Sequence, residues 1–137
     1  PLSPEFVGTW LLAATRRRQT PIKPLLMDSH LIVGIGNIYA AESLFLAGIS
    51  PSRPAQKLNR AQCHRLAEAI KATLARSIAA GGSSVRDCVH SDGGAGSFQL
   101  ACAVYDREGE PCPKCGQPVL AMRQAGRSTF FCPRCQR

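Results

Sequence analysis

Two short cysteine motifs near the end of the chain decide the architecture of its last part. The stretch from Cys112 to Cys135 reads CPKCGQPVLAMRQAGRSTFFCPRC, with 16 residues between its two C-x-x-C motifs. Two such pairs at opposite ends of a β-hairpin complete a tetrahedral four-thiolate zinc site. Because protein ligands fill all four positions, we expect a structural zinc with no open position for water. The predicted ligands are Cys112, Cys115, Cys132 and Cys135. Two disulfides or an iron–sulfur cluster are the alternatives.

The segment around this site is short and basic. From Ala101 onward it is too short to bury a convincing core, so metal binding would supply much of its folding energy. Residues 111–137 contain five Lys or Arg residues and no Asp or Glu. Arg127 lies in the sequence GRST at the expected hairpin tip, where an extended guanidinium can meet phosphates. A solvated surface arginine is the alternative, and the absence of acidic residues favours nucleic acid.

The first three-fifths of the chain predict four helices, over about 3–18, 20–27, 37–47 and 59–80. Gly48 closes the third helix. Asn59 and Gln62 have the spacing of a capping box at the start of the fourth. The core stripe of the fourth helix consists of Cys63, Leu66, Ala67, Ile70, Leu74 and Ile78.

Beyond residue 83 the pattern changes to a glycine-rich loop and short alternating stretches. The stretches 101–105 and 128–131 suit β-strands. We therefore expect a mainly α protein with a small β zinc module: a helical domain over 1–98 and a four-cysteine zinc hairpin over 99–137.

A second motif lies before the third helix. Val33-Gly34-Ile35-Gly36-Asn37 has two glycines at alternate positions, which let the backbone approach a ligand. The following helix N-terminus offers N–H groups and a positive dipole. Asn37 either caps that helix or directs its amide at a phosphate, and Lys23 supplies a countercharge. A tight helix–turn–helix corner without a ligand is the alternative.

Composition limits the partners. The 137 residues are 45% apolar, and 17 Lys and Arg against 9 Asp and Glu give a net charge of +8. That balance favours a polyanionic partner. No apolar run approaches the ~20 residues of a membrane span. Three further cysteines occur singly, at 63, 88 and 102. We expect unpaired thiols, a reducing compartment and a cytoplasmic location. The start PLSPE is neither a signal peptide nor an initiator sequence, which suggests a fragment.

Several motifs together resemble one protein family. The runs IKPLLMD (22–28) and VGIGNIYAAESLF (33–45) resemble the helix–two-turn–helix of bacterial formamidopyrimidine-DNA glycosylases. The glycine-rich loop at 91–98, the stretch 104–112 and the four-cysteine hairpin follow in the family's order. The resemblance therefore covers essentially the whole chain.

The resemblance implies the DNA-binding portion of a base-excision repair enzyme that removes oxidised purines and then cuts the strand by β,δ-elimination. Its partner would be duplex DNA containing oxidised bases or abasic sites, bound by a monomer. Lys23, Gly36, Asn37 and Arg127 would hold phosphates around an everted nucleotide. The loop matching the family's cover over the flipped base consists of Ser91, Asp92, Gly93, Gly94, Ala95, Gly96, Ser97 and Phe98.

The family's catalytic group is not expected here. In the family, an N-terminal proline followed by glutamate, on a separate β-sandwich domain, attacks the sugar C1′ through its amine. Pro1 is followed by Leu2 and Ser3 and matches the family's interdomain segment. We therefore assign no catalytic residue and expect this chain alone to bind DNA weakly at best and not to cleave it.

Two alternatives remain at this stage. An endonuclease VIII-type enzyme for oxidised pyrimidines shares the helical motif and the zinc finger, although the 91–98 loop favours the purine-specific branch. A non-catalytic zinc-ribbon module that binds RNA or a protein is the other.

Overall fold

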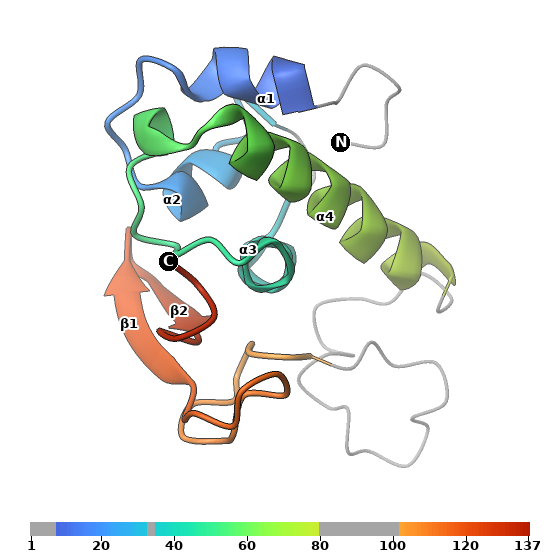
Figure 1. The fold of residues 1–137 in the computed structure, drawn as a ribbon, viewed down its shortest axis with the longest axis vertical. Coiled ribbons are helices and arrows are strands. Elements are labelled where there is room, and N and C mark those ends of the chain that lie inside the picture. Colours follow the sequence, from blue (N-terminus) through green and yellow to red (C-terminus); the bar gives the residue numbers. More distant parts are fainter. Residues whose placement is uncertain (1–7, 33–34, 80–101) are drawn as a thin grey trace.

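The computed structural model describes residues 8–32, 35–79 and 102–137. Its helices are α1 (Gly8–Thr15), α2 (Ile22–Leu26), α3 (Asn37–Ala47) and α4 (Arg60–Ala79), with the 3-10 turn η1 (Ala55–Lys57). The long helix α4 packs on both α1 and α3 (Figure 1). We call residues 8–79 the helical module and residues 102–137 the hairpin module.

Local signals place two of the helix ends as expected. Gly48 ends α3 in the left-handed conformation, with φ of 73°. At the start of α4, the Asn59 N–H donates to Gln62 Oε1 (2.9 Å) and the Gln62 N–H donates to Asn59 Oδ1 (2.8 Å). This reciprocal pair confirms the capping box.

Two expectations about helix ends are wrong. α1 ends at Thr15, before the three arginines, and the chain turns there with the Arg18 N–H donating to the Thr15 carbonyl (3.1 Å). Asn37 does not cap α3, because Gly36 is the N-cap residue and no side chain caps the helix. The Asn37 amide is used in longer-range bonds described below.

The hairpin module contains two antiparallel strands, β1 (Leu120–Gln124) and β2 (Arg127–Phe131). Gln124 pairs with Arg127 across a two-residue turn. The turn residues Ala125 and Gly126 have φ of 50° and 79°. Positive φ at both positions matches the right-handed twist of the flanking strands. The predicted strand at 128–131 is confirmed.

The other predicted strand is absent among the residues that can be described: 102–105 form no strand. The backbone N–H groups of Ala103, Val104 and Tyr105 donate instead to the carboxylate of Glu42 on α3, at 2.7–3.0 Å. A side chain thus takes the hydrogen bonds that a neighbouring strand would have made.

The two larger hydrophobic cores lie on either side of α3. Leu44 and Ala40 face the core of the helical module, together with Leu66 and Ile70 of α4. Phe45 and Ala41 face a second core in the hairpin module. Its other members are Val104, Cys112, Val119 and Cys132. Helix α3 is therefore packed between the two modules and contributes side chains to both cores.

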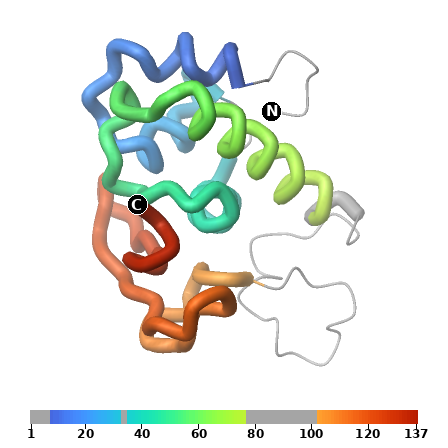
Figure 2. Tube along the Cα trace, viewed as in Figure 1, coloured from blue at the N-terminus to red at the C-terminus, as the bar shows by residue number. Residues whose placement is uncertain are grey.

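The C-terminal end returns to the helical module. The Ser50 N–H donates to the Arg137 carbonyl and the Arg137 N–H donates to the Gly48 carbonyl, both at 3.1 Å. The buried Gln136 side chain donates to the Ile49 carbonyl at 3.0 Å. Figure 2 shows this red end of the chain beside the segment that follows α3.

Several expectations fall outside the described residues: the boundary near residue 98, the glycine-rich loop at 91–98 and the stop after α4. None of the helices in the described ranges combines the length and the apolar composition that a membrane span requires. Cys63 is a buried free thiol as expected, whereas Cys102 is disulfide-bonded. The expectation of an unpaired thiol at Cys102 is therefore wrong, because single cysteines in a sequence do not show whether they pair.

Candidate nucleic-acid interface and metal centre

The fold brings the four predicted metal ligands together. The sulfur atoms of Cys112, Cys115, Cys132 and Cys135 all lie within 4.8 Å of one another. Cys112 Sγ is 3.8 Å from Cys135 Sγ, and Cys115 Sγ is 3.5 Å from Cys132 Sγ. A tetrahedron with Zn–S bonds of ~2.3 Å has sulfur atoms about 3.8 Å apart. The cluster fits one structural Zn2+.

The surroundings of the sulfurs act differently on the individual thiols. The Lys114 N–H donates to Cys112 Sγ and the Cys135 N–H donates to Cys132 Sγ, both at 3.4 Å. Burial raises the pKa of Cys112, but hydrogen bonds from nearby backbone N–H groups outweigh it and lower the pKa to about 7. Burial and the neighbouring thiols raise the pKa of Cys135 to about 12. Four negative sulfurs this close together require a cation, which zinc supplies.

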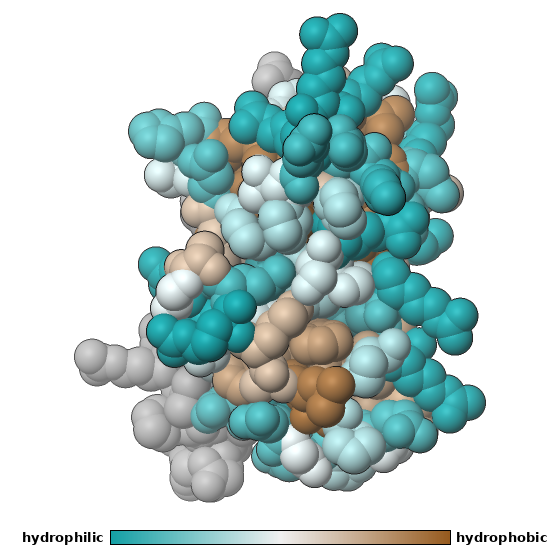
Figure 3. Space-filling model, turned by 90° about the vertical axis from the view of Figure 1, so that its left-hand side faces the viewer, coloured by the Kyte–Doolittle hydropathy of each residue, from teal (hydrophilic) through white to brown (hydrophobic). Residues whose placement is uncertain are grey.

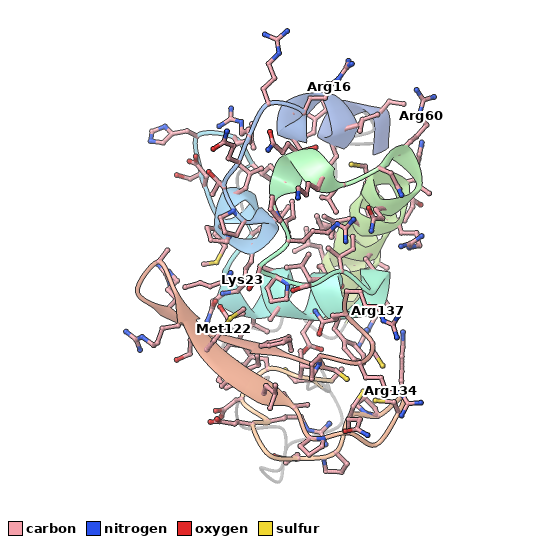
Figure 4. The ribbon with its side chains drawn as sticks, turned by 60° about the vertical axis from the view of Figure 1, so that its left-hand side comes forward. Arg16, Lys23, Arg60, Met122, Arg134 and Arg137 are labelled. Atoms are coloured by element: carbon pink, nitrogen blue, oxygen red, sulfur yellow. The ribbon has the colours of Figure 1, made fainter. Side chains whose placement is uncertain are left out.

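Lys23 is the central residue of the predicted phosphate grip, and it is almost completely buried. Its side chain extends from α2 toward the hairpin (Figure 4) and is 1% exposed. Its Nζ donates to Asn37 Oδ1 (2.5 Å) and to Thr129 Oγ1 (2.8 Å). Burial, followed by the positive charge of Arg127, lowers the pKa of Lys23 to about 8. Lys23 therefore joins the two modules and does not extend freely into solvent.

Asn37 joins α3 to the hairpin. Its Nδ2 donates to the Ser128 carbonyl at 3.0 Å, which turns Oδ1 toward Lys23. The sequence allowed either a capping role or an outward-directed amide. The structure shows the amide bonded to Lys23 and β2.

Arg127 is the exposed cation of the group, at the first position of β2. A cavity of about 190 Å³ lies beside it, between α2 and the hairpin tip. The cavity is lined by Lys23, Pro24, Met27, Gln124, Ala125 and Arg127. The structure thus brings Lys23, Asn37 and Arg127 together from α2, α3 and β2.

Gly36 lies at the entrance to α3, next to this group. Its φ of −90° is open to any residue, and a Cβ placed there would meet nothing within 4 Å. Neither backbone conformation nor packing of the described residues requires glycine at this position.

Three residues escaped the sequence analysis: Thr129, Gln124 and Glu42. Thr129 is fully buried and bonds both Lys23 and Gln124. Glu42, 8% exposed, holds the start of the hairpin module. Glu42 lies 61 residues from its partner Ala103, and Thr129 lies 106 residues from its partner Lys23. No local sequence pattern indicates contacts over such separations. The signal that was available is Glu42 as the single charged residue of the helix Asn37–Ala47.

Comparison with known proteins agrees with this geometry. Residues 1–89 match the formamidopyrimidine-DNA glycosylase H2TH domain, which is about two-thirds of the chain. The chain belongs to the formamidopyrimidine-DNA glycosylase family. Residues 109–137 match the zinc finger found in that family and in isoleucyl-tRNA synthetase. The chain thus comprises the helix–two-turn–helix and zinc finger portion of a family member.

Individual members of the formamidopyrimidine-DNA glycosylase family are close in sequence. The enzyme of Dechloromonas aromatica is 61% identical over 136 residues, covering 99% of this chain and 49% of that protein. The enzyme of Thiobacillus denitrificans is 56% identical over 137 residues, covering 100% of this chain and 51% of that protein. The chain spans about half the length of the curated relatives it matches.

Solved structures of the family share the fold. The crystal structure of the MutM (Fpg) protein of Thermus thermophilus is 45% identical with a TM-score of 0.86, covering 99% of this chain and 52% of that one. A complex of Lactococcus lactis Fpg with DNA containing an abasic site is 34% identical with a TM-score of 0.84. It covers 99% of this chain and 49% of that one.

Proposed function

We propose that this chain is the DNA-gripping portion of a bacterial formamidopyrimidine-DNA glycosylase and AP lyase, an enzyme that removes oxidised purines. The proposal is carried by the cavity that Lys23 and Arg127 line together, with Asn37 hydrogen-bonded to Lys23, in a chain of this family. The partner is duplex DNA with an oxidised base or an abasic site, bound by one copy of the protein in the bacterial cytoplasm.

Arg127, Gly36 and Lys23 contribute in different ways to binding of the DNA backbone. Arg127 is exposed and offers a planar set of donors, so it reaches the phosphate directly. Gly36 lets a phosphate approach the N-terminus of α3, where helical N–H groups and the dipole favour an anion. Lys23, which lines the cavity, adds a positive charge and donates to the phosphate through the ammonium proton that neither Asn37 nor Thr129 accepts. Such contacts fix position on the duplex and leave base recognition to other parts of the enzyme.

The glycine-rich loop, Ser91 to Phe98, is proposed to cover the flipped base, as its resemblance to the family implies. Extrusion of the target nucleotide exposes the base to such a loop.

Binding can be tested with the zinc-loaded chain and three fluorescent ligands: a duplex with a tetrahydrofuran abasic analogue, the intact duplex and a single-stranded RNA. We expect preference for the abasic duplex, because an everted nucleotide fits the grip, and affinity that falls steeply with salt. Arg127→Gln should weaken binding about tenfold, whereas Arg60→Gln, at the far end of the helical module (Figure 4), should not. Equal affinity for all three ligands would favour the generic zinc-ribbon interpretation.

Catalysis is proposed to require the rest of the enzyme, since the chain spans only half of its relatives' length. Borohydride trapping on an 8-oxoguanine duplex should give no covalent adduct with this chain alone. An adduct that depends on Pro1 would falsify this part of the proposal. Excision assays on 8-oxoguanine and on oxidised pyrimidines, made with the natural enzyme that contains this chain, separate the purine enzyme from the endonuclease VIII type.

A further inference from the structure

The Lys23 ammonium is held by a chain of hydrogen bonds that ends on a backbone carbonyl. Thr129 Oγ1 accepts from Lys23 Nζ at 2.8 Å and donates to Gln124 Oε1 at 3.0 Å. Gln124 Nε2 donates to the Pro51 carbonyl at 3.1 Å. Because a carbonyl only accepts, it fixes the orientation of the Gln124 amide, which in turn fixes the direction of the Thr129 hydroxyl. The lone pairs of Thr129 are therefore left for Lys23.

The other acceptor of Lys23 is fixed in the same manner. The Asn37 amide donates to the Ser128 carbonyl, so its oxygen faces the ammonium. An ammonium has three protons to donate. The described part of the chain supplies acceptors to two of them, Asn37 Oδ1 and Thr129 Oγ1.

The charges around Lys23 are unbalanced. The guanidinium of Arg127 on β2 is the charged group that affects it, whereas α3 contributes the neutral amide of Asn37 and β1 that of Gln124. Among the described residues, no carboxylate forms an ion pair with Lys23. Lys23 and Arg127 both line the cavity of about 190 Å³ between α2 and the hairpin tip. An anion is the ligand chemistry that this pair of cations favours.

We propose that Thr129, supported by Gln124, is a positioning residue that orients the Lys23 ammonium so that its third proton serves a DNA backbone phosphate. This inference rests on the proposed function of the Lys23–Arg127 cavity. Thr129 itself does not touch the phosphate and acts through Lys23.

The first test needs no DNA. The Lys23 ammonium is titrated by NMR in the zinc-loaded chain, in the wild type and in Thr129→Val, which keeps the shape and removes the hydroxyl. Loss of one acceptor of a charged donor should lower the midpoint by about one pH unit. Thr129→Ser restores the hydroxyl and should return the midpoint to the wild-type value. Gln124→Leu should produce a smaller decrease, because the hydroxyl then loses its fixed direction.

The second test asks whether Thr129 acts through Lys23. Affinity for the tetrahydrofuran duplex is measured in a double-mutant cycle of Thr129→Val and Lys23→Met. Thr129→Val alone should weaken binding about tenfold. In the Lys23→Met background it should have no further effect. The zinc content and melting temperature of every variant are measured as folding controls.

The results distinguish this inference from the proposed function. An unchanged Lys23 midpoint in Thr129→Val and Gln124→Leu overturns the positioning role, as does an equal loss of affinity in both Lys23 backgrounds. If Arg127→Gln and Lys23→Met leave binding unchanged, the proposed function fails, whatever the NMR titration shows. If both weaken binding while Thr129→Val does not, the phosphate grip stands and the positioning role is wrong.

Discussion

A buried ammonium between two modules must be compensated by its neighbours. Lys23 is 1% exposed, and its compensation consists of two neutral oxygens, one from α3 and one from β2. Neutral partners offset part of the cost of removing a charge from water, and a neighbouring guanidinium adds to that cost. The lowered pKa of Lys23, about 8, expresses this imbalance. A bound phosphate would compensate the positive charge of Lys23. The buried ammonium that destabilises the free protein would therefore favour binding of an anion.

This imbalance predicts a pH dependence of stability. The ordinary pKa of lysine is 10.5 and the folded value is about 8, so between these values the unfolded chain binds more protons than the folded one. Stability contributed by Lys23 therefore rises as the pH increases from 8 to 10.5, by at most about 3 kcal/mol.

The measurement is urea unfolding of the zinc-loaded wild type and Lys23→Met at about pH 7 to 10, which spans the folded pKa. Their difference should move in favour of the wild type as the pH rises. A difference that stays constant would show that Lys23 titrates at its ordinary value in the folded protein.

At the scale of elements, α3 and the hairpin module depend on each other. α3 is buried on both sides, with Leu44 in one core and Phe45 in the other. The ammonium of Lys114, from the first cysteine motif, lies 5.1 Å from the centre of the Phe45 ring. Glu42 binds three successive backbone N–H groups of the segment that leads into the hairpin. The hydrogen bonds of Glu42 and the apolar packing of Phe45 together fix the position of the hairpin module against α3.

Glu42→Gln should weaken this anchor. The amide keeps one acceptor oxygen and places an NH2 group against backbone N–H donors, which leaves buried donors without an acceptor. We expect a loss of about 1–3 kcal/mol in the free energy of unfolding. Amide hydrogen exchange at residues 103–105 should rise at the same time.

Glu68→Gln is the matched control. Glu68 has 73% of its side chain exposed and lies 4.0 Å from Lys71, so its loss should cost little. Equal effects of the two substitutions would contradict the anchoring role of Glu42.

The sequence predicted those features that short-range contacts decide. The capping box of α4, the left-handed Gly48 and the two cysteine pairs each involve residues a few positions apart, and each was confirmed. The sequence left the role of Asn37 open between a helix cap and an amide directed at a phosphate, because the partners of its amide lie 14 and 91 residues away. The strand expected at 101–105 does not form in the described part, because the backbone N–H groups there donate to the Glu42 carboxylate. Alternating hydrophobicity predicts a strand but cannot show which group accepts its N–H bonds.

At the scale of the whole molecule, the separate cores predict that zinc removal acts on one module. The core of the helical module contains no metal ligand, whereas the hairpin core includes Cys112 and Cys132. Chelation should therefore increase amide exchange across β1 and β2 while the helices α1 and α4 stay protected. DNA binding should be lost together with the hairpin, because Thr129 and Arg127 come from it, and zinc should restore both. Simultaneous loss of protection in α4 would show that the two modules fold as one unit.

The surface of the molecule combines general positive charge with the proposed phosphate-binding group of Lys23, Asn37 and Arg127. Figure 3 shows hydrophilic side chains over the upper, helical part and a hydrophobic patch lower down, at the level of the hairpin module. The net charge of +8 becomes about +6 with zinc bound, because four thiolates subtract four charges and the metal returns two. A charge of this size attracts DNA from a distance whatever residue carries it.

Salt dependence separates general attraction from direct phosphate contact. The logarithm of the DNA-binding constant falls linearly with the logarithm of the salt concentration, with a slope set by the number of phosphates neutralised. Arg127→Gln and Arg60→Gln each remove one positive charge, but Figure 4 places Arg60 at the end of the molecule away from Lys23. Loss of Arg127 should reduce the magnitude of the slope by about one, and loss of Arg60 should leave the slope unchanged. Anisotropy titrations with the abasic duplex from 50 to 300 mM salt, roughly the range in which such slopes are resolved, make the comparison. If both variants change the slope equally, net charge and not the grip at the hairpin tip holds the DNA.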